Sequence, residues 1–363
     1  MILPPSSAEA DRLCDEGYAL LEAGRIKEAH ALLARARSLA PSNPLVHYRL
    51  GLLFNDTGRP AEALEALDTS LSLQPDNPRA HNNRGSALQL LGRASEAEKA
   101  FQRALDLSPD LELPYVNLGH LMEQQGKVQE ATELYERAMA RGLDPTLFSH
   151  YLAAASGRVT HRAPDRWVSA TFDNFAPTFD AHVQSLGYIA PRVLAAMVRS
   201  RAAEMLDVLD LGCGTGQCGL SLSQQKRYLV GIDLSEKMLA QARALGIYDE
   251  LHLAEVHTWI RGVSAARFNL VIAADVLIYI GDLGDLFHGA ARSLQPGGWF
   301  AFSSEECESA DYTLLPSGRY AQSQPYIRRL AEPAFTVVAA DPAVIRMESD
   351  NPLMGRLYLL QRY

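Results

Sequence analysis

The first part of the chain repeats itself every 34 residues, and this feature constrains the fold more than any other. Large apolar residues recur at that interval, and small residues recur beside them. Small residues let two helices cross closely, and glycine ends a helix at a turn. The spacing therefore predicts pairs of antiparallel helices that stack into a solenoid. Two sets of glycines keep the register without a slip: Gly17, Gly51, Gly85 and Gly119, then Gly24, Gly58, Gly92 and Gly126.

These landmarks resemble the tetratricopeptide repeat. We expect an all-α array over residues 8–157, closed by a capping helix, with repeats at about 10–43, 44–77, 78–111 and 112–145. The resemblance implies a concave surface that binds a peptide or protein partner.

Two amide side chains are candidate substrate-binding residues on that surface. Asn83 and Asn117 lie one repeat apart, and amides at this spacing could hydrogen-bond a peptide backbone. The alternative is that asparagine is simply common at this position of the repeat.

The pattern changes after a polar linker at residues 158–170, and residues 171–363 alternate strands with helices. A buried strand over 208–212 runs into a glycine-rich turn over 213–216, and a second strand over 228–232 ends at Asp233. Glycines let a ligand lie against the backbone, and the helix beyond offers unpaired N–H groups. A strand-end carboxylate can accept hydrogen bonds from both hydroxyls of a ribose. The segment therefore predicts a nucleoside-binding site.

Two interpretations of the glycine-rich turn compete. Gly214, Gly216 and Gly219 satisfy the G-x-G-x-x-G spacing of a nicotinamide or flavin domain. In that pattern the first glycine follows the strand at once, whereas here residues 210–213 intervene and Asp210 ends the strand. The sequence V-L-D-L-G-C-G-T-G instead resembles motif I of class I methyltransferases.

Four further segments resemble the same family in the same order: 233–239, 253–255, 268–277 and 294–300. The resemblance implies a Rossmann-like class I methyltransferase domain over residues 171–363, with a seven-stranded mixed sheet, and S-adenosylmethionine as cofactor. At Glu255 the family usually has Asp, which takes the adenine amino group. The residues that the resemblance assigns to the cofactor are Asp210, Gly212, Gly214, Gly216, Asp233, Leu234, Met238, Ala254, Glu255 and Ala274.

The segment 172–182, with Leu186-Gly187-Tyr188, resembles the lead-in helix of one subgroup. That subgroup comprises tetratricopeptide-fused methyltransferases related to trans-aconitate methyltransferases. The resemblance covers nearly the whole chain and implies an enzyme of the methyltransferase class.

Methyl transfer is an in-line displacement at a sulfonium carbon, so alignment and water exclusion matter more than many catalytic groups. Candidate catalytic residues are His182, Tyr279 and Glu305, on segments that should border the pocket. Arg319, with Tyr320, could bind an anionic acceptor. Each of these residues also fits a structural role. The family resemblance and the lack of an obvious acid–base pair favour a carboxylate acceptor, which is ionised near pH 7.

Composition and net charge limit the kinds of partner that the chain is expected to bind. The net charge is −9, and acidic residues outnumber basic ones in both halves, which disfavours nucleic acid and anionic membranes as partners. No export signal or membrane span is recognisable, so we expect a cytoplasmic protein. The four cysteines are scattered, which predicts reduced thiols and no metal site.

The sequence thus predicts a methyltransferase whose acceptor is carried by a peptide, a protein or a carrier-bound small molecule recruited by the array. Two alternatives stay open. The chain could be a scaffold whose second domain binds the cofactor without turnover, or a small-molecule O-methyltransferase whose repeats only mediate oligomerisation. The oligomeric state itself is not predicted.

Overall fold

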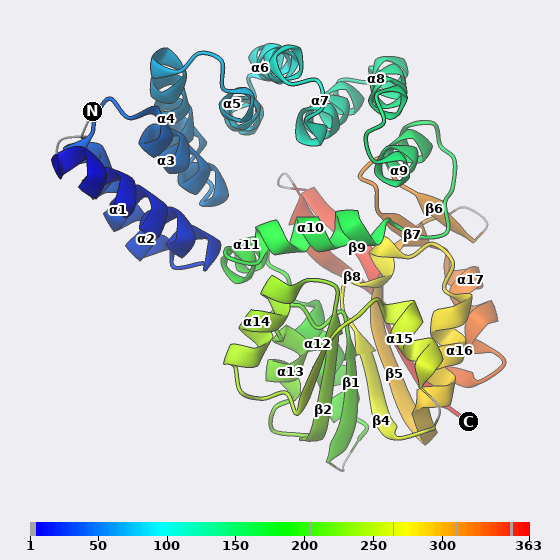
Figure 1. Cartoon of the computed structure of the whole chain (residues 1–363). Helices are drawn as coiled ribbons and strands as arrows, with labels where there is room; N and C mark the ends of the chain where they lie inside the picture. The colour runs from blue at the N-terminus through cyan, green and yellow to red at the C-terminus, as the bar shows by residue number, and fades with distance from the viewer. Residues whose placement is uncertain (1–4, 203–204, 264, 309–310, 349–350) are drawn as a thin grey trace. The chain divides into compact units, whose positions relative to one another are not determined.

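The chain divides into two units, Met1–Ser156 and Gly157–Tyr363, each with its own set of internal contacts (Figure 1). The structure is a computed structural model. It describes residues 5–202, 205–263, 265–308, 311–348 and 351–363.

The described part of the first unit is helical throughout, as the repeat spacing predicts. Its helices are α1 (Pro5–Glu22), α2 (Ile26–Leu39), α3 (Pro44–Asp56), α4 (Pro60–Leu73), α5 (Pro78–Leu90), α6 (Ala94–Leu107), α7 (Glu112–Gln124), α8 (Val128–Ala140) and α9 (Pro145–Ala155).

The first glycine of each repeat lies where two helices cross. A Cβ added at Gly51 would lie 2.5 Å from Leu67 Cγ, and one at Gly119 would lie 2.2 Å from Tyr135 Oη. Both large partners are fully buried. The glycines therefore recur because the second helix of each repeat places a large side chain against the backbone of the first.

Polar side chains and proline begin the first helix of several repeats. The side chains of Asn43, Asn77 and Asp144 accept hydrogen bonds from backbone N–H groups at the starts of α3, α5 and α9. Each is followed by proline at the first helical position, where its missing N–H costs nothing. The helix starts are thus fixed locally by the sequence.

The second unit is an α/β domain around one mixed sheet. Its strands are β1 (Leu206–Leu211), β2 (Lys226–Asp233), β3 (Glu250–Leu253), β4 (Phe268–Ala273), β5 (Leu294–Glu306), β6 (Tyr312–Leu314), β7 (Tyr320–Gln322), β8 (Phe335–Glu348) and β9 (Asn351–Arg362). Its helices are α10 (Asp165–Phe175), α11 (Phe179–Ser185), α12 (Ala190–Arg199), α13 (Gln217–Leu222), α14 (Glu236–Ala244), α15 (Val256–Gly262), the 3₁₀ turn η1 (Leu277–Tyr279), α16 (Gly284–Ser293) and α17 (Gln324–Ala331).

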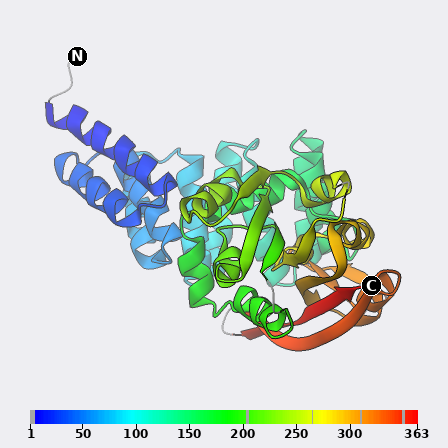
Figure 2. The ribbon, with the colours of Figure 1, turned by 90° about the horizontal axis from the view of Figure 1, so that it is seen from below.

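The sheet confirms the predicted fold class and corrects its strand number. β3, β2, β1, β4 and β5 run parallel in that order, β9 pairs antiparallel with β5, and β8 pairs with β9. Figure 2 shows β8 and β9 side by side, in orange and red. Among the described residues the sheet has nine strands rather than seven. The two extra strands are the short β6 and β7, which add to the end of β5 at Glu305 and Glu306.

Helices cover both faces of this sheet. One apolar core joins alternate residues of β1 and β4 to α15, α16 and α17, and includes Leu209, Val271 and Phe287. The other joins the intervening residues to α12 and α13, and includes Val208 and Leu194. Strands buried on both faces need continuous apolar runs, as their sequences show.

The strand order reverses between β1 and β4, since β2 follows on one side and β5 on the other. Loops that leave two such strands diverge and open a crevice at the carboxyl edge of the sheet. The glycine-rich turn follows β1 at this edge, and the loop over 274–282 follows β4. This position is where a ligand site is expected in a doubly wound fold.

Candidate functional site

A cavity of about 570 Å³ opens at the carboxyl edge of the sheet in the second unit. The glycine-rich turn, the end of β2, the loop after β4 and the helices α10 and α11 form its walls. Predicted cofactor residues that line it are Gly212, Gly214, Asp233, Leu234, Met238, Glu255 and Ala274.

The glycine-rich turn needs its glycines for two different reasons. Gly212 has φ 62° and a Cβ there would lie 2.4 Å from Val276 Cγ2, so the turn passes too close to the loop after β4 for a side chain. Gly214 has φ 54° and no atom lies within 4 Å of its virtual Cβ. Both φ values disfavour other residues, and Gly214 leaves open space at the wall of the cavity.

Asp233 stands at the end of β2, where the sequence placed a ribose-binding carboxylate. Its Oδ2 accepts a hydrogen bond from Gly214 N at 2.8 Å, and its Oδ1 accepts one from Ser235 N at 2.8 Å. Burial raises the pKa of Asp233, and these backbone hydrogen bonds oppose that rise. The carboxylate is thus held in one orientation beside the glycine-rich turn.

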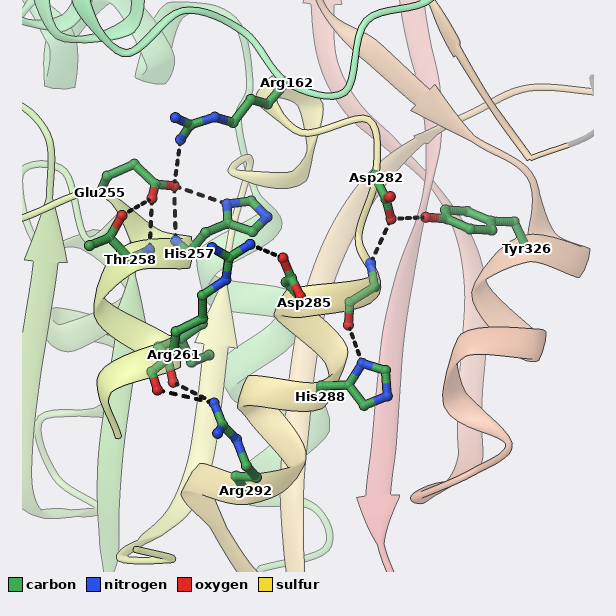
Figure 3. Close-up of polar contacts among 12 residues, drawn as sticks. Arg162, Glu255, His257, Thr258, Arg261, Asp282, Asp285, His288, Arg292 and Tyr326 are labelled. Carbon is green, nitrogen blue, oxygen red and sulfur yellow. Dashed lines mark hydrogen bonds and ion pairs between the residues drawn. The ribbon is translucent and has the colours of Figure 1, made fainter. Parts of the chain in front are cut away.

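Glu255 caps the start of α15, which follows β3. In the strand order, β3 lies on one side of β1, and β5 and β7, which carry or follow the acceptor candidates Glu305 and Arg319, lie on the other. Its carboxylate accepts hydrogen bonds from His257 N, Thr258 N and Thr258 Oγ1, and lies 2.9 Å from His257 Nδ1. Burial acts to raise the pKa of Glu255, but the hydrogen bonds from His257 and Thr258 hold it well below its usual range. Arg162 Nη1 lies 3.3 Å from the same carboxylate and points toward it (Figure 3). The carboxylate is therefore ionised and already ordered by five groups.

Three of the predicted cofactor residues do not line the cavity in the described structure: Asp210, Gly216 and Ala254. Asp210 lies beneath the glycine-rich turn and accepts a hydrogen bond from Tyr248 Oη at 2.7 Å. Burial raises the pKa of Asp210 to about 7. Gly216 packs against Leu245 and Tyr248, where a Cβ would not fit. Asp210 and Tyr248 therefore support the turn from behind, and Ala254 N donates a hydrogen bond to Asp233 O at 3.0 Å.

Helices α10 and α11 cover the cavity with aromatic side chains. Phe172, Phe175 and Phe179 line it, and Phe172 also packs edge-on against Tyr279 with ring centroids 5.5 Å apart. Two carboxylates attach these helices to the cofactor loops. Asp173 accepts from Ser235 Oγ at 2.5 Å, and Asp180 accepts from Thr215 Oγ1 at 2.6 Å. The cover therefore places an apolar surface over a polar floor.

The segment predicted as a linker contributes to this site. Ala163 N donates to Tyr279 O at 2.9 Å, and Arg162 forms an antiparallel bridge with Ile280. Helix α10 then begins at Asp165, and the predicted lead-in helix continues as α11 after a break at residues 176–178. Residues 161–163 are thus paired with the loop after β4.

A cluster of charged side chains borders the other end of the cavity, beyond β4. Arg346 Nη1 lies 2.8 Å from Asp275 Oδ2, and Arg346 Nη2 lies 2.7 Å from Glu305 Oε1. Arg319 Nε lies 3.1 Å from the same oxygen of Glu305. Asp275, Arg319 and Arg346 line the cavity, while Glu305 is 2% exposed behind them. The cluster contains two cations and two anions.

The predicted catalytic residues fall into different surroundings. Tyr279 lines the cavity, and burial raises its pKa, so it stays protonated at neutral pH. Burial also raises the pKa of Glu305, although its two arginines oppose the rise. The side chain of His182 lies outside the described residues. Its role stays a prediction.

The predicted acceptor residues separate in the structure. Arg319 lines the cavity, whereas Tyr320 is buried on β7, where its hydroxyl hydrogen-bonds Thr160 Oγ1. In the first unit, Asn83 Nδ2 donates to Arg79 O at 2.8 Å and Asn117 Nδ2 donates to Asn82 Oδ1 at 3.0 Å. Both amide N–H groups thus bond within the array.

Sequence reasoning missed three charged residues of the site: Arg162, Asp275 and Arg346. Arg346 is 71 residues from Asp275 and 41 from Glu305 along the chain, and no motif surrounds it. Asp275 stood inside the segment that resembled the fourth-strand motif, but its charge was not used. An acid at the end of a central parallel strand is a signal that could have found it.

The described residues contain neither a membrane-spanning helix nor a cluster of metal ligands. No helix in the described ranges is long and apolar enough to cross a membrane. Among the same residues, no group of three or more His, Cys, Asp or Glu side chains could hold a metal ion.

Known family models match segments in both units of the chain. Residues 208–298 match the family model described as a methyltransferase domain, and residues 20–85, 78–111 and 115–147 match tetratricopeptide repeat models. The ubiquinone biosynthesis O-methyltransferase of Hydrogenovibrio crunogenus is 29% identical over 136 residues, which cover 36% of this chain and 55% of that protein. The malonyl-[acyl-carrier protein] O-methyltransferase of Pseudescherichia vulneris is 30% identical over 139 residues, which cover 38% and 53%. The chain thus spans about half the length of these curated relatives.

Two solved structures are similar to this chain at low sequence identity and low TM-score. The magnesium protoporphyrin IX methyltransferase of Synechocystis, solved with bound S-adenosylhomocysteine, is 17% identical, with a TM-score of 0.38 over 50% of this chain and 83% of that one. The 1,6-didemethyltoxoflavin N1-methyltransferase of Burkholderia thailandensis is 17% identical, with a TM-score of 0.44 over 56% and 92%.

Proposed function

We propose that this chain, which carries tetratricopeptide repeats and a class I S-adenosylmethionine-dependent methyltransferase domain, methylates a carboxylate oxygen of an acceptor that the repeats recruit. The observation that carries the proposal is Arg319, which lines the cavity beyond the cofactor residues and pairs with a buried glutamate. A guanidinium presents parallel N–H groups that match the two oxygens of a carboxylate.

The floor of the cavity fits S-adenosylmethionine. Gly214 leaves open space for a ligand against the backbone, and Asp233 stands beside it, oriented by two backbone N–H groups. Leu234 and Met238 line the wall next to Asp233 and suit the faces of an adenine ring. Asp233 would accept the ribose hydroxyls, and Glu255 lies where the adenine amino group is expected.

A carboxylate acceptor fits the described carboxylates of the charged cluster, since Asp275 and Glu305 are both paired with Arg346. Such an acceptor is ionised at neutral pH and has no proton to lose. Tyr279 stays protonated because burial raises its pKa, so it serves as a hydrogen-bond donor that orients the acceptor oxygen. Glu305 is bound to Arg346, which makes it a support for the arginines rather than a proton acceptor.

The protein's part in the reaction is alignment and exclusion of water. When bound, the cofactor supplies an electrophilic methyl carbon on a sulfonium sulfur. Transfer of that methyl group to the acceptor oxygen would give a methyl ester and S-adenosylhomocysteine. Arg319 and Tyr279 would hold the oxygen in line, and Phe172, Phe175 and Phe179 would keep water out.

The repeats would bind the peptide or protein that bears the acceptor. One N–H of each of Asn83 and Asn117 bonds within the array, and the amide oxygens would accept hydrogen bonds from a peptide backbone. The relative named as acting on malonyl-[acyl-carrier protein] supports an acceptor presented by a carrier protein. A carrier would place its bound acid in the cavity while the array holds the carrier itself.

Labelled methyl transfer tests the carboxylate. The full-length protein is incubated with methyl-labelled S-adenosylmethionine and size-fractionated host extract, and the labelled product is then treated with mild alkali. A methyl ester releases its label as volatile methanol, whereas N-methyl and ether products keep it. We expect alkali-labile label on a macromolecular fraction, and alkali-stable label would refute the carboxylate proposal.

Arg319→Met tests the acceptor site directly. We expect the KM for the acceptor to rise roughly 10- to 100-fold, because a charge-assisted pair is lost, with little change in cofactor affinity. Arg356→Met is the matched control, since Arg356 lies on β9, pairs with Glu306 at 3.0 Å and does not line the cavity. An unchanged KM in Arg319→Met would remove Arg319 from acceptor binding.

Deletion of residues 1–156 tests recruitment. The truncated protein keeps Thr160 and Ala163, which hydrogen-bond to residues of the second unit. We expect cofactor affinity to be kept and methylation of the natural acceptor to fall sharply, because the acceptor is no longer held nearby. Full methylation by the truncated protein would contradict recruitment by the repeats.

A further inference from the structure

The Asp275–Arg346 ion pair faces the cavity next to the glycine-rich turn. The two side chains are bonded at 2.8 Å between Asp275 Oδ2 and Arg346 Nη1. Both line the cavity, and their side chains are 23% and 9% exposed. Neither residue belongs to the set that the family resemblance assigns to the cofactor.

The order of strands places Asp275 closer to the glycine-rich turn than Arg319 is. Asp275 follows β4, which pairs directly with β1, the strand that carries the glycine-rich turn. The next residue, Val276, touches that turn, since a Cβ at Gly212 would lie 2.4 Å from its side chain. Arg319 instead precedes β7, which pairs with β5, one strand further away. Arg346 comes from β8 and reaches Asp275 through their ion pair, so Asp275 brings the pair to the cavity wall beside the glycine-rich turn.

The backbone at Asp275 is held in an unusual conformation. Asp275 has a φ of 62°, and no other non-glycine residue in the described ranges has a positive φ. The Oγ of Ser303 accepts a hydrogen bond from Asp275 N at 2.8 Å and fixes this conformation from the neighbouring strand. Such strain persists where the surrounding structure imposes it, and it often marks a ligand site. Here it sets the place of a carboxylate at the cavity wall.

We propose that Asp275 and Arg346 together bind the amino acid end of the cofactor, with the α-ammonium on Asp275 and the α-carboxylate on Arg346. The cofactor ends in a zwitterion, and a zwitterion laid against an ion pair places every charge beside an opposite one. A lone carboxylate bound to Arg346 would face Asp275 and, behind it, Glu305, which lies 2.7 Å from Arg346. Like charges at this distance disfavour such an anion.

This assignment gives the two arginines of the cluster different roles. Arg346, between two carboxylates, would serve the cofactor, and Arg319 would serve the acceptor. The inference deepens the cofactor half of the proposed function and does not depend on which acceptor is methylated.

Calorimetry with two nucleosides tests the pair. S-adenosylhomocysteine carries the zwitterion, whereas 5′-methylthioadenosine has the same nucleoside and thioether without the amino acid. In Asp275→Asn and in Arg346→Met, we expect affinity for S-adenosylhomocysteine to fall roughly 10- to 100-fold, because a charged partner is lost. Affinity for 5′-methylthioadenosine should stay within about twofold, because that ligand does not reach the pair.

Three comparisons make the outcome decisive. Arg356→Met, which removes an arginine of the same sheet outside the cavity, should leave both affinities at the wild-type values. Unchanged binding of S-adenosylhomocysteine in Asp275→Asn, or an equal loss of affinity for both nucleosides, would overturn the proposal. Asparagine keeps the size of Asp275 and tolerates a positive φ, so this variant decides the question if Arg346→Met does not fold. No acceptor is present, so failure here is distinct from failure to form a methyl ester.

Discussion

Replacing Asp233 by asparagine should weaken cofactor binding by an amount that the structure lets us work out. The two carboxylate oxygens of Asp233 accept from different backbone donors, Gly214 N and Ser235 N, each at 2.8 Å. An asparagine has only one oxygen, so in either orientation its NH₂ group faces one of these N–H groups. The variant therefore loses one charge-assisted hydrogen bond inside the protein, worth about 1.5–3 kcal/mol.

The ribose contact suffers in the same way. A carboxylate can accept from both ribose hydroxyls, whereas a neutral amide offers one weaker acceptor. Losing about 1.5–3 kcal/mol of binding free energy raises the dissociation constant roughly 10- to 150-fold. Calorimetry with S-adenosylhomocysteine measures this change, and a thermal melt of the cofactor-free protein measures the accompanying loss of stability.

Asp207→Asn is the matched control for Asp233→Asn. Asp207 lies on β1 and pairs with the side chain of Arg227, which is 61% exposed. An exposed pair contributes about 0–1 kcal/mol, so affinity and melting temperature should change little. Wild-type affinity in Asp233→Asn, with the control also unchanged, would refute the assignment of Asp233 to the ribose.

Two further predictions concern stability. Gly119→Ala should lower the melting temperature of the repeat array, because its Cβ would lie 2.2 Å from the buried Tyr135 Oη, and overpacking of about 1–3 kcal/mol exceeds the helix-propensity gain of about 1 kcal/mol. The control Gly262→Ala, with no atom within 4 Å, should melt at or above the wild-type temperature, and equal effects in both would contradict the packing argument. Burial raises the pKa of Asp210 to about 7, so the folded state keeps a proton that the unfolded state loses above about pH 4. The contribution of Asp210 to the free energy of unfolding of the cofactor-free protein should therefore fall between about pH 4 and 7 and then level off, and Asp210→Asn should show a smaller fall than the wild type in melts at several pH values.

The sequence predicted those parts of the fold whose causes are local. The glycine and large apolar positions of the repeats recur because each pair is in contact within one helix hairpin, as Gly51 and Leu67 are. Asp233 was predictable because it ends a strand a fixed distance after the glycine-rich turn, and its partner Gly214 belongs to that turn. The strands β6 and β7 were not predicted, since three-residue strands leave almost no pattern.

The charged cluster of Asp275, Glu305, Arg319 and Arg346 was predictable only in part because its residues come together through long-range pairing. Glu305 and Arg319 were identified singly, but their contact arises because β7 adds to the end of β5. Arg346 reaches Asp275 and Glu305 because β8 returns beside β9, which pairs with β5 in register with Glu305. No spacing in the chain encodes that arrangement. The same topology explains why the glycine-rich turn and Asp233 follow a motif while the charged cluster does not. The turn and Asp233 lie at the ends of neighbouring strands, whereas Arg319 and Arg346 come from segments beyond β5.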